Sequence, residues 1–118
     1  MRRVQDLRNP ALAVELARQA LAREPNNGSF QNTLGVALYR THDWVGAIKA
    51  LERGLELRHG GTATGFFFLA MAHWKKGDKE KARTWSDKGV AWMEQNSLDS
   101  LDLEAFRGEA KATLGQPT

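Results

Sequence analysis

Cysteine is absent from this chain of 118 residues, which excludes a disulfide framework and every thiolate metal site. Proline occurs only three times, so a long proline-rich linker is excluded as well. The longest apolar run, Phe66–Ala72, is far shorter than the roughly 18 residues that a membrane-spanning helix needs. The charged start, Met1–Asp6, has no apolar stretch behind it and so does not look like a secretory signal. We therefore expect a cytoplasmic protein with no membrane partner.

A strong excess of one charge is also missing. The chain has 17 basic and 14 acidic residues and a net charge of +3, without the dense basic stripe of a nucleic-acid-binding protein. Hydrophobic residues make up 42% and charged residues 26%, which is ordinary for a globular protein. The length suits one core, so we predict a single domain over residues 1–118.

The residue patterns of catalytic and metal sites are not found. No pair among His42, His59 and His73 has the i, i+4 spacing with a carboxylate that a metal site would need. The pair Gly60–Gly61 lacks the lysine and the preceding strand of a phosphate-binding loop, and no serine lies in a nucleophile elbow. We predict that the protein is not an enzyme and that it has no cofactor or metal.

What the chain does contain is an internal repeat. Residues 33–47 align with residues 68–82, and a half copy precedes them. Each unit is predicted as two helices joined by a tight turn. Small residues recur in register, in one set at Ala13, Ala47 and Ala82 and in another at Ala20, Gly54 and Gly89.

Helix boundaries can be predicted from capping residues and apolar spacing. Asn9 followed by Pro10 starts a helix that reaches Glu24, where Pro25–Gly28 ends it. Further helices are expected at about 29–40, 43–57, 64–76 and 79–94. Gly77 is expected to take the left-handed conformation at one turn, and Asp43 and Asp78 are the expected caps of the helices that follow the turns.

The tail predicts one more amphipathic helix within residues 99–115. Its apolar positions are Leu101, Phe106, Ala110 and Leu114, and charged residues lie between them. A repeat stack needs such a helix to cover its last apolar face.

The pattern resembles the tetratricopeptide repeat (TPR) family over roughly residues 9–96. Leu34–Gly35, Leu69–Ala70 and the alanines of the small-residue sets carry the resemblance. It implies an all-α fold of antiparallel helix pairs in a right-handed superhelix, with a half repeat (9–27), two repeats (28–61 and 62–97) and a capping helix (99–115). The resemblance assigns repeat packing to Ala13, Ala20, Leu34, Gly35, Ala47, Gly54, Leu69, Ala70, Ala82 and Gly89.

The sequence departs from the family pattern at a few positions. His73 stands where the family often has an aromatic residue, and neither full repeat has the closing proline. The start at a half repeat predicts a fragment or terminal module of a longer protein. The closing repeat is similar to repeats appended to multidomain bacterial signalling proteins, including Ser/Thr kinases.

The resemblance also implies a function, which is binding of a protein or peptide on the concave face formed by the first helix of each pair. Such a face would be apolar and aromatic with two cations, and it would suit an amphipathic helix or an extended peptide with an acidic end. The competing interpretation places Phe67 and Met71 in the core and leaves Arg40 and Lys75 as a solvated rim. The family's variable concave positions fall on Asn32, Val36, Tyr39, Arg40, Phe67, Met71, Trp74 and Lys75.

Two alternatives stay open at this stage. A stack that begins with a second helix exposes Leu12, Leu16 and Ala20, which favours self-association as a homodimer through the N-terminal helix. Nucleic-acid binding would depend on a small basic cluster in the first segment, and the mild net charge does not favour it. That cluster consists of Arg2, Arg3, Arg8, Arg18 and Arg23.

Overall fold

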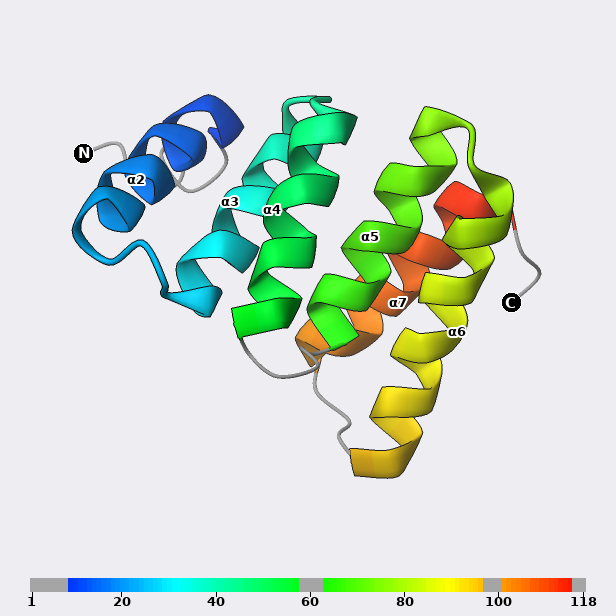
Figure 1. Ribbon diagram of the computed structural model, residues 1–118. Helices are drawn as coiled ribbons and strands as arrows, with labels where there is room; N and C mark the ends of the chain where they lie inside the picture. Colours follow the sequence, from blue (N-terminus) through cyan, green and yellow to red (C-terminus); the bar gives the residue numbers. More distant parts are fainter. Residues whose placement is uncertain (1–8, 58–62, 97–100, 116–118) are drawn as a thin grey trace.

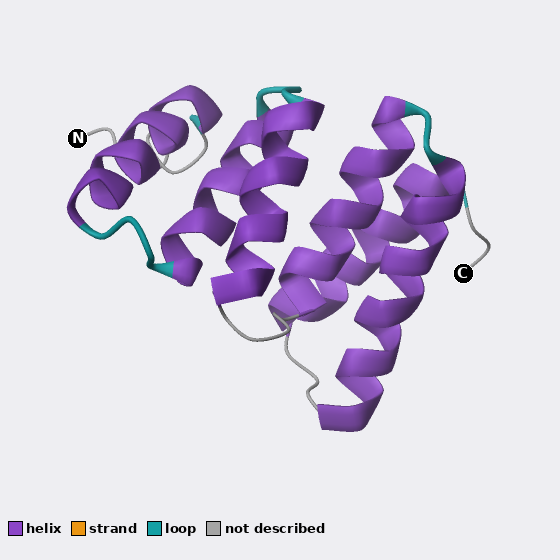
Figure 2. Cartoon of the chain, in the orientation of Figure 1, coloured by secondary structure: helices purple, strands orange, loops and turns teal. Residues whose placement is uncertain are grey.

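The computed structural model describes residues 9–57, 63–96 and 101–115 (Figure 1). These ranges contain helices and no strand, which confirms the all-α prediction (Figure 2). The helices are α2 (Pro10–Arg23), α3 (Gly28–Arg40), α4 (Trp44–Leu57), α5 (Ala63–Lys76), α6 (Lys79–Asn96) and α7 (Leu101–Leu114). The charged start Met1–Asp6, the residues His59, Gly60 and Gly61, and the arginines Arg2, Arg3 and Arg8 lie outside the described residues.

The helix starts are capped as predicted. The side-chain oxygen of Asn9 accepts a hydrogen bond from the Leu12 amide at 3.1 Å. Asp43 accepts one from the Gly46 amide at 2.9 Å, and Asp78 accepts one from the Lys81 amide at 3.2 Å. Each cap satisfies an amide that the helix itself leaves without a partner. Gly77 has a φ of 100°, so the left-handed turn before α6 is also confirmed.

The helices stack in chain order, with α3 against α4, α5 against α6, and α2 and α4 each against the helix that follows (Figure 1). Close approaches between helices occur at glycine residues. A Cβ atom on Gly35 would lie 2.5 Å from Cγ of Leu51, and one on Gly89 would lie 2.6 Å from the Phe67 ring. At Gly54 the nearest atom would be the Gly28 carbonyl oxygen at 3.3 Å. Larger residues at Gly35 and Gly89 would push the paired helices apart.

Helix α5 is the centre of the core. It packs against α4, α6 and α7, and every residue from Gly65 to His73 is buried. A helix that is buried all round is expected to be apolar all round, which explains the run Phe66–Ala72. None of the helices in the described ranges combines the length and the apolar character needed to span a bilayer.

Helix α7 does not continue the pattern of the stack. Helix α5 packs more extensively against α4, the helix directly before it, than against α3, the helix before that. Helix α7 differs, because it packs less extensively against α6, the helix directly before it, than against α5. In Figure 1, α7 lies behind α5, and the rings of Phe68 and Phe106 meet edge to face with their centroids 5.2 Å apart. The tail helix therefore covers mainly the first helix of the last pair.

His73 makes the stability of this core sensitive to pH. It is buried in α5, and neither ring nitrogen has a hydrogen-bond partner among the described residues. Burial lowers the pKa of the His73 imidazole, and the nearby carboxylates of Asp78 and Glu52 only partly oppose this. The unfolded chain therefore binds a proton more readily than the folded protein does. As the pH falls from about 6.5 toward the lower folded-state pKa, the free energy of unfolding decreases.

Replacing His73 with leucine tests this pH dependence. We expect His73→Leu to weaken the fall in stability between pH 7.5 and pH 5, and to raise the free energy of unfolding at pH 5 by about 1 kcal/mol, because an unpaired buried polar group is removed. Urea denaturation at both pH values measures this. His42→Asn, at an exposed turn position, is the control and should keep the wild-type pH dependence. Parallel pH curves for His73→Leu and the wild type would contradict the assignment.

Candidate functional site

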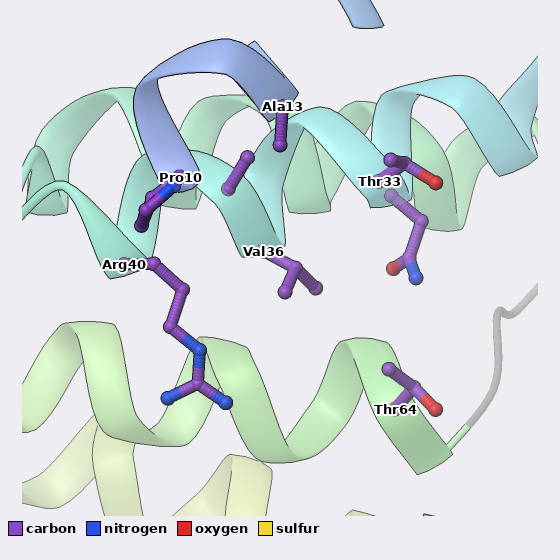
Figure 3. Close-up of a pocket in the computed structure, with 8 residues that line it drawn as sticks. Pro10, Ala13, Thr33, Val36, Arg40 and Thr64 are labelled. Atoms are coloured by element: carbon purple, nitrogen blue, oxygen red, sulfur yellow. The ribbon is translucent and has the colours of Figure 1, made fainter. Parts of the chain in front are cut away.

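A cleft opens between α2, α3 and α5 (Figure 3). Its volume of about 590 Å³ falls within the range of ligand-binding pockets, roughly 300–1,000 Å³. Helix α3 forms the main wall, while α2 and the first turn of α5 form the sides. The lining residues are Pro10, Ala13, Asn32, Thr33, Val36, Ala37, Arg40 and Thr64.

The chemistry of the cleft changes along its length. Asn32, Val36 and Arg40 recur every four residues along α3 and so lie on one side of it. Figure 3 shows Val36 in the middle, with Arg40 near Pro10 at one end and Thr64 at the other. An apolar middle with hydrogen-bonding groups at one end and a guanidinium at the other suits a peptide better than a wholly apolar ligand.

Arg40 joins the cleft to α7. Its guanidinium donates two hydrogen bonds to the Glu109 carboxylate, one from Nη1 to Oε2 and one from Nη2 to Oε1 at 2.9 Å. The group also lies over the Phe68 ring, with Cζ 5.1 Å from the centroid. Hydrogen bonding to Glu109 raises the pKa of the Arg40 guanidinium against the weaker opposing effect of burial, so the cation is retained. The Arg40 side chain is still 40% exposed.

Comparison with known proteins identifies the repeat. A family model described as tetratricopeptide repeat matches residues 2–63. The chain belongs to the tetratricopeptide repeat family. A TPR repeat-containing protein of Pseudomonas aeruginosa is 33% identical over 108 residues, which cover 92% of this chain and 41% of the relative. The chain thus spans less than half of that relative, and the division into a half repeat, two repeats and a cap stays a prediction.

The TPR resemblance places eight residues on one concave face, and the structure brings only part of them together. Asn32, Val36 and Arg40 line the cleft. Tyr39, their neighbour on α3, is buried and packs against the rings of Trp44 and Phe68, with centroids 5.2 and 5.5 Å away. Burial also raises the pKa of the Tyr39 hydroxyl.

The prediction for the middle of α5 is wrong. Phe67 and Met71 have an exposed fraction of 0%, so neither side chain offers a surface to a partner in this fold. Phe67 packs over Gly89 of α6, where the missing side chain leaves room for its ring. The core interpretation of these two residues is the correct one. The α5 residue that does reach the cleft is Thr64.

Trp74 and Lys75 lie near the C-terminal end of α5 and do not line the cleft. The cations Lys79 and Arg83 of α6 sit 5.1 and 5.8 Å from the Trp74 ring centroid. Lys75 is exposed and its Nζ lies 5.9 Å from the Trp44 ring centroid. Both residues are thus engaged in cation–π contacts on a surface apart from the cleft.

Sequence reasoning missed the contributions of α2 and of the first turn of α5. Ala13 is predicted to pack between repeats and Pro10 to start a helix, yet both also face the cleft. Thr33 and Ala37 each follow a predicted residue by one position and could have been included by widening the α3 face. Within the ranges that the structure describes, no three acidic or histidine side chains gather as a metal site would require.

Proposed function

We propose that this TPR chain is a non-catalytic module that binds a peptide segment of another protein in the cleft between α2, α3 and α5. TPR repeats mediate protein–protein interaction, and the volume and lining of the cleft support it as the surface that is used. The observation that carries the proposal is the cleft's combination of a Val36-centred apolar wall with the Arg40 cation at one end. A cytoplasmic location and a place in a larger bacterial signalling protein are further proposals.

The cleft indicates the chemistry of the peptide. A short apolar side chain would contact Val36 and Ala13, and the peptide backbone would hydrogen-bond to the side chains of Asn32 and Thr64. A carboxylate directed toward Arg40 would meet a guanidinium whose planar donors suit bidentate recognition.

The test starts from peptides that are selected for binding to the wild-type chain from a random display library. Their affinity for a Val36→Glu variant should be lower by about tenfold or more, because a carboxylate would then lie in the apolar middle of the cleft. Fluorescence titration measures the loss. Val45→Glu is the matched control, since Val45 is exposed on α4 and does not line the cleft.

The two variants must first show the same helical circular dichroism and melting behaviour as the wild type. Equal affinity of Val36→Glu and Val45→Glu for the selected peptides would place the binding surface elsewhere. Failure of the library to yield any binder would equally count against the cleft.

Self-association through α2 is the second candidate, and one observation favours it. Leu16 is 54% exposed on α2 among the described residues. Light scattering over a range of concentrations tests the idea: a mass that rises to that of a dimer supports it, and a constant monomer mass contradicts it. The basic cluster proposed for nucleic acid is represented in the described residues by Arg18 and Arg23, which are exposed.

A further inference from the structure

Helix α7 covers a surface that the regular stack would leave open. Phe106, Glu109 and Thr113 are spaced i, i+3 and i+7 and so lie on one side of α7. Each of them approaches a residue of α3 or α5. Phe106 meets the fully buried Phe68 ring, Glu109 pairs with Arg40, and Thr113 lies near the Tyr39 hydroxyl. The link from Arg40 to Glu109 joins residues 69 positions apart in the chain.

Several features of α7 indicate a helix that can be displaced. Gly108 lies in its middle, and a Cβ atom added there would have no neighbouring atom within 4 Å, so this glycine lowers helix propensity without allowing a close approach. In the described part of the chain, Nε of Arg107 is buried without a hydrogen-bond partner. The side chains of the Arg40–Glu109 pair are 40% and 32% exposed, so water partly screens the attraction that holds α7 at this point.

We propose that the surface under α7 is itself a docking site for a partner helix, and that α7 occupies it as an internal substitute. The partner is an amphipathic helix with an aromatic residue that packs on Phe68 and, three positions later, a glutamate that pairs with Arg40. The charge and ring contacts that α7 makes define this chemistry. The inference rests on the proposed function and names a partner class for the surface that adjoins the cleft at Arg40.

Arg40 connects the two surfaces. It lines the cleft and also holds Glu109, so a carboxylate that reaches it from the cleft competes with α7. We call a chain open when α7 has moved off this surface. A ligand that binds only open chains has an apparent affinity equal to its intrinsic affinity multiplied by the fraction of chains that are open. Substitutions that loosen α7 therefore strengthen binding in trans.

A synthetic peptide of residues 101–115 serves as the probe, added to the full chain and followed by fluorescence anisotropy. We expect Glu109→Gln in the chain to tighten peptide binding about fivefold, and Phe106→Ala about tenfold or more, because each removes one contact that holds α7 closed. Glu104→Gln is the matched control, since that carboxylate lies 3.9 Å from Arg107 of the same helix, and it should leave the affinity unchanged.

A charge exchange tests where the peptide binds. Arg40→Glu in the Phe106→Ala chain should abolish binding of the natural peptide, and a peptide with Glu109→Arg should restore it. Binding that is indifferent to Arg40, or absent from all loosened chains, would overturn the proposal. A wild-type dimer that the peptide dissociates would assign the surface to a second copy and would also overturn it. If library-selected peptides still depend on Val36 in that case, the cleft function stands without this inference.

Discussion

Truncation of Phe68 to alanine is expected to lower the free energy of unfolding by about 4 kcal/mol, the largest effect we expect from a single substitution. The ring is fully buried and lies edge to face with Tyr39 of α3 and Phe106 of α7. The Arg40 guanidinium lies over the same ring, 5.1 Å from its centroid. Phe68→Ala would therefore leave a cavity where three helices meet. Urea denaturation followed by circular dichroism measures the loss.

Phe66→Ala is the matched control, since the two phenylalanines share one helix. Phe66 is 9% exposed and stacks on Trp85 of α6, and it does not line the cleft. We expect it to lose about half as much stability, because its site is partly open to solvent and can relax. It should also leave α7 in place. Equal losses for the two variants would contradict the role of Phe68 as the link between α3, α5 and α7.

The second large effect is expected at Gly35, where alanine should lower the free energy of unfolding by about 2 kcal/mol. A Cβ atom there would lie 2.5 Å from Cγ and 3.2 Å from the backbone nitrogen of Leu51. Leu51 has no exposed surface, so its side chain cannot give way into solvent. The helix propensity gained by replacing glycine is smaller than the cost of forcing α3 and α4 apart.

The same substitution at Gly108 is expected to act in the opposite direction. Nothing lies within 4 Å of a Cβ atom at this position in α7, so only the gain in helix propensity remains, about 1 kcal/mol. Thermal and urea denaturation of the two alanine variants give both signs in one experiment. Equal changes at Gly35 and Gly108 would show that the close contact with Leu51 does not govern the packing of α3 on α4.

The helices could be predicted from the sequence because their signals are local. Asn9, Asp43 and Asp78 cap helices within three residues of themselves, and Gly77 ends one through its own backbone. The predicted bounds therefore differ from the observed ones by only a few residues. His42 is an exception among these local signals. It adopts a φ of 68° at a position where the corresponding turn of the next helix pair has Gly77. No local pattern around His42 predicts that a histidine would accept that conformation.

The candidate site could be predicted only in part because its α5 half depends on tertiary contacts. Val36 and Met71 occupy corresponding positions of two repeats, and helical spacing alone cannot distinguish a groove residue from a core residue. Val36 faces an open cleft, whereas Met71 is enclosed in a helix that α4, α6 and α7 surround. The tail is predicted to cap the stack, but nothing in its apolar pattern shows that it would settle mainly on α5.

The placement of α7 also bears on how the chain folds. Packing between consecutive helices requires only short loops to close, so α2 to α6 can assemble quickly from local contacts. The pairing of Arg40 with Glu109 must instead close a loop of 69 positions. During synthesis from the N-terminus, at about 5–20 residues per second, α5 leaves the ribosome before α7 does. For a period on the order of seconds the nascent chain then presents the Phe68 ring to its surroundings, which makes this segment the natural point of contact for a chaperone.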